Sequence, residues 1–142
     1  MPIKSKDLLL LATELAASPI EVKRRAAISR AYYASYHRCI DWEGRLPQTG
    51  DPKKLKGSHE SLISRLRYPD PACGTHIATC SREIGDELEI QRRNRAHADY
   101  KVKAWISTHM LDEQLQRAAK VLDLCDRSER VIARHSRLSA KR

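Results

Sequence analysis

Residues 28–37 read ISRAYYASYH and lie within a longer stretch, 20–43, that contains neither proline nor glycine. Apolar or small side chains recur there every three or four positions, which indicates one face of an α-helix. The side chains that we expect to be buried are Ile20, Ala27, Ile28, Ala31, Tyr32, Ala34, Ser35, Cys39 and Trp42. The stretch therefore predicts a long helix, from residue 18 to residue 42 or 44, whose small residues let a neighbouring helix approach closely.

The opposite stripe of this predicted helix is polar and consists of Lys23, Arg30, Tyr33, His37 and Asp41. Spacings of three and four residues place these side chains on one side of a helix. A polar stripe usually faces solvent. The combination of arginine, tyrosine and histidine also suits contact with a partner or a ligand, and both interpretations stay open at this point.

Four further helices are predicted from periodicity and capping signals, over residues 5–17, 58–68, 75 to about 100, and 108 to about 126. Ser5, Ser18, Ser58 and either Ser107 or Thr108 are the expected N-caps, with Glu21 closing a capping box for the second helix. The segment LPQTGDPKKLKG, 46–57, predicts a loop. We therefore expect an all-α, up-and-down bundle of four main helices plus a short one.

The chain has 142 residues, a length typical of one domain, which we assign to residues 1–126. Residues 127–142 form a basic C-terminal tail that either continues the last helix or frays into solvent. We expect the first helix to bury Leu8, Leu11, Ala12 and Leu15, the fourth to bury Ile77, Cys80, Ile84, Leu88 and Gln91, and the fifth to bury Leu111, Leu115, Ala118, Ala119, Leu122 and Cys125.

The net charge of +9 favours a polyanionic partner, nucleic acid before a membrane. The longest apolar run, LLLLA at 8–12, is far shorter than the roughly 20 residues that span a bilayer. No signal-peptide cleavage site follows it, so we expect a cytoplasmic protein with reduced cysteines. The segment CGTHIATC, 73–80, lacks a fourth ligand at the spacing of a zinc site, and we expect neither a metal nor a cofactor.

The segment RRNRAHADYK, 92–101, is the most unusual polar cluster of the chain. A helix turns 100° per residue, so Arg93 and His97 stack one turn apart, whereas Arg92 and His97 diverge by about 140°. A helix that loosened near His97 would still let Arg92 swing round. Asp99 is placed to accept a hydrogen bond from His97 or to cap the next segment.

Three interpretations of this cluster follow from its chemistry. An arginine beside a histidine suits RNA cleavage, in which the imidazole moves a proton and the guanidinium neutralises charge on the phosphate. The same residues suit phosphate binding without chemistry. Alternatively, Arg95 and Asp99 form an ordinary ion pair at the end of a helix, worth a few tenths of a kcal/mol.

Four segments taken together resemble the HEPN superfamily, in particular its small stand-alone prokaryotic members. In those proteins an S-R-A-Y-Y-A helix precedes an S-H helix, an R-x-x-A-D-Y end and a terminal helix. The matching segments are ISRAYYASYH at 28–37, KGSHESLISRL at 56–66, RRNRAHADY at 92–100 and DEQLQRAAKVLDL at 112–124. The resemblance covers about residues 5–125 and implies a helical bundle that is usually a homodimer.

The resemblance also implies a function. Many HEPN proteins are metal-independent endoribonucleases that cleave single-stranded RNA at a composite dimer site and act as toxins or defence effectors, often with a nucleotidyltransferase-type antitoxin. Other members only bind a nucleotide, RNA or a partner protein. The resemblance makes Arg92 or Arg93 the motif arginine and His97 the motif histidine. It assigns supporting or RNA-binding roles to Asn94, Arg95, Asp99, Tyr100, Arg30 and Tyr33.

His59 also matches the family, because a histidine follows the serine at this helix start. A histidine at the start of a helix is more often a local contact than a catalyst, and we leave His59 out of the catalytic set. Tyr32, Tyr33 and Tyr36 are interpreted first as packing and dimer-interface residues, because aromatic side chains dominate such burial.

Overall fold

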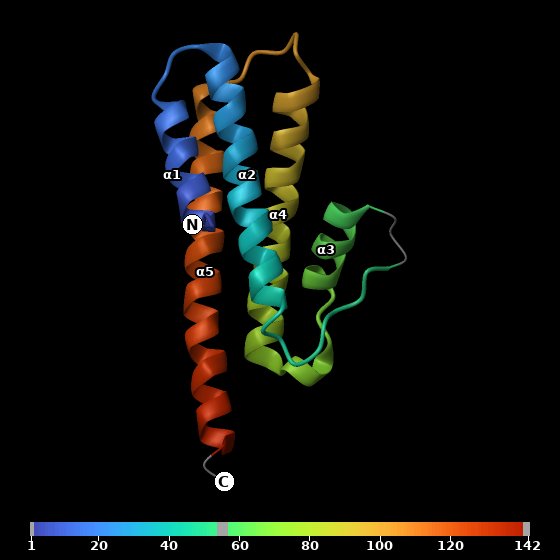
Figure 1. The fold of residues 1–142 in the computed structure, drawn as a ribbon. Helices are drawn as coiled ribbons and strands as arrows, with labels where there is room; N and C mark the ends of the chain where they lie inside the picture. Colours follow the sequence, from blue (N-terminus) through green and yellow to red (C-terminus); the bar gives the residue numbers. More distant parts are fainter. Residues whose placement is uncertain (1, 54–56, 141–142) are drawn as a thin grey trace.

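The computed structural model of the chain describes residues 2–53 and 57–140, and every regular element in that part is helical. The elements are α1 (Ser5–Ala16), α2 (Glu21–Glu43), α3 (Ser58–Arg67), a short 3-10 helix η1 (Pro71–Cys73), α4 (Thr75–Tyr100) and α5 (Thr108–Ala140). Helices α1, α2, α4 and α5 run alternately up and down and form the bundle, while the short α3 lies outside it (Figure 1). The predicted all-α class is confirmed.

Helix α2 is the centre of the bundle because it packs against α1, α4 and α5. All but one member of its predicted buried stripe are buried, and Tyr32 and Trp42 are completely so. Each large side chain buried in this way contributes about 1.5–3 kcal/mol relative to an exposed one. The exception is Ile20, which is 51% exposed because it precedes the first turn of α2.

Helix α3 packs closely against α4 because a glycine stands at the contact. A Cβ atom at Gly85 would lie 2.7 Å from the Cγ atom of Arg67 and 3.1 Å from the Cβ atom of Leu66. The Ser81 hydroxyl donates a 2.6 Å hydrogen bond to the Leu66 carbonyl oxygen at the same place. These contacts fix α3, and with it His59, beside the α2–α4 pair.

Three of the four predicted N-caps are wrong, those of α1, α2 and α3. The backbone of Lys4, not Ser5, caps α1, and its N–H donates to the Asp7 carboxylate at 2.7 Å. The Ser18 hydroxyl accepts from the Ile20 N–H ahead of α2, and the Glu21 carboxylate accepts from the distant Ile106 N–H instead of closing a capping box. At the start of α2, a tertiary contact thus replaces the predicted local capping interaction.

The other helix starts lie close to prediction. Helix α3 begins at Ser58, but its N-cap is Gly57 rather than Ser58. The Ser107 hydroxyl accepts a 3.0 Å hydrogen bond from the Met110 N–H, as expected of the N-cap of α5. The predicted loop 46–57 is non-helical where it is described, and its residues 54–56 lie outside the described residues. Helix α5 runs on into the tail as far as residue 140.

Several side chains that were predicted to face inward are exposed or only partly buried. Leu11 is 41% exposed, and Leu9 packs instead against the buried cluster of Ala12, Ala31 and Ala118. Ala119 is exposed, because the inward row of α5 passes through Ala118 and includes the buried polar residue Gln114. In the fourth helix, Ile77 and Cys80 are only partly buried.

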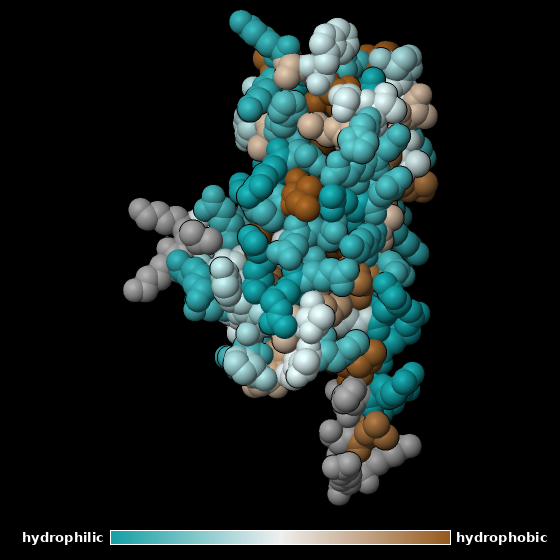
Figure 2. Space-filling model, turned by 180° about the vertical axis from the view of Figure 1, so that it is seen from behind, coloured by the Kyte–Doolittle hydropathy of each residue, from teal (hydrophilic) through white to brown (hydrophobic). Residues whose placement is uncertain are grey.

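The surface seen from behind is mostly hydrophilic, with scattered hydrophobic side chains (Figure 2). Among the described residues, no helix combines the length and the apolar character needed to cross a bilayer.

Candidate nucleic-acid interface

The basic segment 92–101 occupies the last turns of α4, which stays helical through Tyr100. The Lys101 N–H donates to the His97 carbonyl oxygen at 3.1 Å, so the helix does not loosen near His97. Arg92 and His97 therefore keep their separation of about 140° around the axis and lie on different flanks of α4.

Arg92 and Arg93 share one acidic partner, Glu89. Arg92 donates two hydrogen bonds to its carboxylate, at 2.9 and 3.0 Å, and Arg93 donates one at 3.1 Å. Burial raises the pKa of Glu89, but the hydrogen bonds and charges of the two arginines outweigh this and lower the pKa below its ordinary value. Two guanidinium groups on one carboxylate leave a net positive charge beside α3.

Arg95 lies between a carboxylate and two aromatic rings. Its Nε atom donates a 2.8 Å hydrogen bond to Asp99, and its guanidinium carbon lies 5.4 Å from the ring centre of Tyr33 and 5.7 Å from that of Tyr100. Arg30 contacts Tyr33 at 5.0 Å and has no ion pair within the described part of the chain. The predicted Arg95–Asp99 pair is thus present, and Asp99 serves Arg95 rather than His97.

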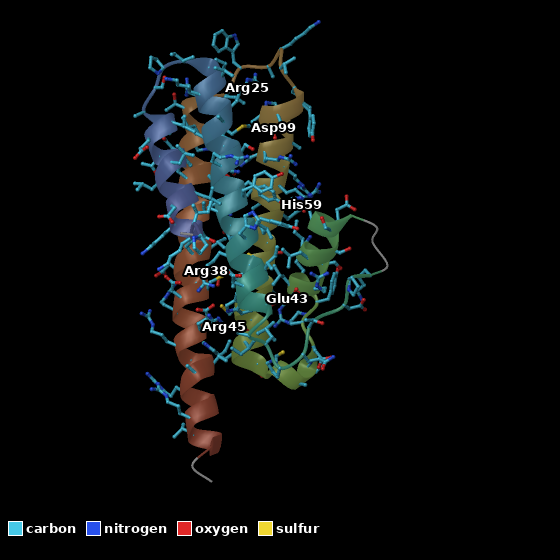
Figure 3. All side chains as sticks on the ribbon, in the orientation of Figure 1. Arg25, Arg38, Glu43, Arg45, His59 and Asp99 are labelled. Carbon is cyan, nitrogen blue, oxygen red and sulfur yellow. The ribbon has the colours of Figure 1, made fainter. Side chains whose placement is uncertain are left out.

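The three tyrosines of α2 enclose His59 from α3. The Oη atom of Tyr32 and the Nδ1 atom of His59 are 2.5 Å apart. The imidazole stacks on Tyr36, with ring centres 4.2 Å apart, and meets Tyr33 edge-on. Figure 3 labels His59 at the upper end of α3 and Asp99 above it on α4.

The electrostatic surroundings of His59 favour its neutral form. Partial burial, followed by the positive charges of Arg95 and Arg92, lowers the pKa of His59 below its ordinary value of 6.5. Burial raises the pKa of Tyr32, so its hydroxyl stays protonated at neutral pH. The result is a neutral imidazole held against a neutral phenol and close to two cations.

The other flank of α4 is tied to α5 by buried amides. The Asn94 side chain donates a 3.0 Å hydrogen bond to Gln114, which in turn donates to the carbonyl oxygens of Ile28 and Gln91 at 3.2 and 3.1 Å. His97 lies about 60° from Asn94 around the helix axis. It is half-buried, and its imidazole makes no hydrogen bond to a residue that the structure describes.

The structure thus divides the predicted site residues between two surfaces. We call the first the tyrosine–arginine face; it consists of Arg30, Tyr33, Tyr36, His59, Arg92, Arg95, Asp99 and Tyr100. Asn94 and His97 belong to the opposite flank, and Arg93 is exposed at the edge of the face.

Three residues of this region, Tyr36, Glu89 and His59, were not predicted to belong to the site; Tyr36 was interpreted as a packing or dimer-interface residue. Glu89 was detectable, since it stands three and four residues before Arg92 and Arg93. His59 had a weaker signal, because no periodicity within α3 shows that its ring meets the tyrosines of another helix.

No group of three or more His, Cys, Asp or Glu side chains suited to holding a metal occurs among the described residues. The four cysteines are free thiols. Comparison of the chain with protein-family models, with curated proteins and with solved structures gave no match. The HEPN resemblance therefore stands on the quoted motifs alone.

Proposed function

We propose that this chain is a HEPN-type RNA-binding protein that forms a cytoplasmic homodimer and cleaves single-stranded RNA without a metal, as a toxin or defence effector. The observation that carries the proposal is the tyrosine–arginine face, where Tyr33 contacts both Arg30 and Arg95. Arg30 and Tyr33 belong to one of the quoted motifs and Arg95 to another, and these two motifs are in contact in the folded chain.

The composition of this face suits an unpaired RNA strand. Proteins bind single strands by stacking bases on aromatic rings and guanidinium planes while cations hold the phosphates. Tyr100 is 69% exposed, so its ring can stack on a base, and Arg30, which has no ion pair among the described residues, suits a phosphate. The net charge of +9 adds long-range attraction, so affinity should fall steeply with salt.

Cleavage requires the ribose 2′-OH to attack the adjacent phosphate while a histidine moves a proton and arginines stabilise the charge on the phosphoryl oxygens. The resemblance gives these roles to His97 and to Arg92 or Arg93. Because His97 and Arg92 lie on opposite flanks of α4, a composite site would pair His97 of one copy with the arginines of the other.

A second candidate function is a non-catalytic HEPN module that binds a nucleotide, RNA or a partner protein such as a nucleotidyltransferase-type antitoxin. The Arg92–Glu89 pair favours it, because the guanidinium of Arg92 donates hydrogen bonds of 2.9 and 3.0 Å to a carboxylate of the same chain, which partly neutralises its charge. An arginine paired in this way can contribute to a binding surface while it keeps its hydrogen bonds to Glu89, whereas catalysis would require it to exchange that partner for the phosphate.

The test is incubation of the purified protein with labelled single-stranded RNA in EDTA, alongside its His97→Ala variant. Products that end in 2′,3′-cyclic phosphate from wild type, lost in the variant, would support the composite ribonuclease site. RNA that is bound but never cut would support the non-catalytic module. Absence of both binding and cutting would reject the ribonuclease and an RNA-binding module, and would leave a module that binds a nucleotide or a partner protein.

Binding itself is tested by Arg30→Gln, with Arg82→Gln as the matched control. Both changes remove one positive charge, but Arg82 is exposed near the start of α4, away from the face. We expect Arg30→Gln to weaken RNA binding by about tenfold, equivalent to about 1.4 kcal/mol. Light scattering should show a dimer, and a monomer would contradict the composite site.

A further inference from the structure

We infer that His59 is a catalytic residue of the proposed RNA cleavage, and that its Nε2 atom accepts the proton of the attacking 2′-OH. The inference rests on the proposed function and adds a residue that the Arg–His motif does not contain. Four observations carry it: the hydrogen bond at Nδ1, the stacked ring, the absence of a partner for Nε2 among the described residues, and the adjacent arginines.

The imidazole of His59 is held in one orientation by two contacts on α2. Its Nδ1 atom lies 2.5 Å from the Tyr32 Oη atom, and its ring lies on Tyr36 with a centre-to-centre distance of 4.2 Å. Tyr32 is itself completely buried, so its hydroxyl is a fixed point. A histidine oriented through Nδ1 presents Nε2 for proton transfer, which is how general-base histidines are commonly arranged.

The Nε2 atom of His59 makes no hydrogen bond to any residue that the structure describes. The ring is only partly buried, so this nitrogen is available to a ligand. To act as a base it must carry a lone pair, which requires the Nδ1–H to donate to the Tyr32 oxygen. The charges of Arg92 and Arg95 and the partial burial keep the ring neutral and therefore able to accept a proton.

The step then balances as follows. The 2′-oxygen forms a bond to phosphorus, its proton passes to Nε2 of His59, and the bond between phosphorus and the 5′-oxygen breaks. The departing 5′-oxygen takes a proton from His97 of the other copy in the proposed composite site, water carries the proton of His59 back to that histidine, and the other product is a 2′,3′-cyclic phosphate. Arg92 and Arg95 lie near enough to His59 to lower its pKa, and they would stabilise the charge on the phosphoryl oxygens.

The experiment compares cleavage of single-stranded RNA by wild type, His59→Ala and His76→Ala. The control is closely matched, because His59 and His76 are each the second residue of a helix, and His76 is exposed. We expect His59→Ala to slow cleavage by about 10²- to 10⁴-fold, the usual contribution of a general base, and His76→Ala to change it less than about twofold.

A second measurement uses the wild-type protein, so that folding of a variant does not matter. RNA methylated at every 2′-oxygen binds without being cut, and the ¹⁵N resonance of the His59 Nε2 atom is followed by NMR as this RNA is added. A change at that nitrogen supports its contact with the strand. An unchanged Nε2 resonance in the presence of bound RNA overturns the inference.

The outcomes separate this inference from the proposed function. Wild type that cuts RNA while His59→Ala cuts equally well overturns the role of His59 and leaves the ribonuclease intact. Wild type that binds RNA but does not cut it overturns the proposed cleavage and the role of His59 together. A loss in His59→Ala with unchanged RNA affinity supports both.

Discussion

The two flanks of α4 differ in the side chains that they present and in how those side chains are paired. On the flank toward α2 and α3, arginines meet tyrosine rings and His59, and the charges are only partly neutralised. On the flank toward α5, Asn94 and Gln114 satisfy each other and the backbone inside the bundle. The flank toward α2 and α3 has the features of a binding surface, whereas the flank toward α5 connects two helices of the bundle.

This difference shows that two residues of a motif on a helix can point to different sides, even when their spacing matches the motif. Arg92 and His97 are five positions apart, and in an unbroken helix that interval corresponds to an angle of about 140° around the axis. The histidine that does join the arginines comes from α3, more than thirty positions earlier in the chain, because Gly85 lets that helix approach α4.

We expect the largest effect on stability from removing the hydrogen bonds of Gln114 between α4 and α5. Gln114 is completely buried and makes three hydrogen bonds. Replacing it by Leu leaves buried polar partners unsatisfied, and we expect the free energy of unfolding to fall by about 3 kcal/mol. Chemical denaturation measures this loss. Gln116→Leu, an exposed position on the same helix, should change stability by less than about 0.5 kcal/mol.

Displacing α3 should damage the other flank selectively. Gly85→Val places side-chain atoms where Arg67 and Leu66 already lie, and we expect about 2 kcal/mol of destabilisation from overpacking. RNA binding should weaken because His59 moves with α3. The control is Gly57→Val, where an added Cβ meets nothing within 4 Å. Equal RNA affinity in Gly85→Val and wild type would show that the position of α3 does not matter for binding.

The lowered pKa of His59 predicts how stability and cleavage change at acidic pH. Because the pKa of His59 is lowered by folding from its ordinary 6.5, the unfolded chain binds this proton more readily. Its contribution to the free energy of unfolding therefore decreases as the pH falls below about 6.5. The neutral imidazole, and with it the proposed cleavage, is lost over the lower range where folded His59 takes up its proton.

Several charged or titratable groups face His59 and set this behaviour; they are Tyr32, Tyr33, Tyr36 and His37 from α2, and Arg92 and Arg95 from α4. Arg95→Gln removes one nearby positive charge and should raise the pKa of His59 toward its ordinary value. An NMR titration of the imidazole reports this shift. A pKa that fell or stayed the same would remove Arg95 from the surroundings of His59.

The smallest expected effect separates the two neighbouring arginines. The Arg93 side chain is 73% exposed, whereas that of Arg92 is 30% exposed and makes two hydrogen bonds. We expect Arg93→Gln to change the free energy of unfolding by less than about 0.5 kcal/mol, and Arg92→Gln to lower it by about 1 kcal/mol. Thermal unfolding of both variants measures these two changes in stability. A larger loss of unfolding free energy in Arg93→Gln than in Arg92→Gln would contradict the expectation that Arg92 contributes more to stability.

Much of the fold was predictable from the sequence, because the periodicity of α2 places Tyr32 and Trp42 in the core without any tertiary information. The N-caps of α1, α2 and α3 were not predicted correctly; at α2 the reason is that Glu21 accepts a hydrogen bond from the distant Ile106 N–H. For the site, the pairing of Arg95 with Asp99 followed from their spacing. The position of His59 did not, because it depends on how α3 docks rather than on any local pattern.

The most direct test of the account is an NMR map of the RNA-contacting surface, using ¹⁵N-labelled protein and a short single-stranded RNA methylated at its 2′-oxygens. The account predicts that the changes in resonance gather on the tyrosine–arginine face, at Tyr33, His59 and Arg95. Changes gathered around Asn94 and His97 instead, with His59 unaffected, would contradict it and place the RNA on the α5 flank.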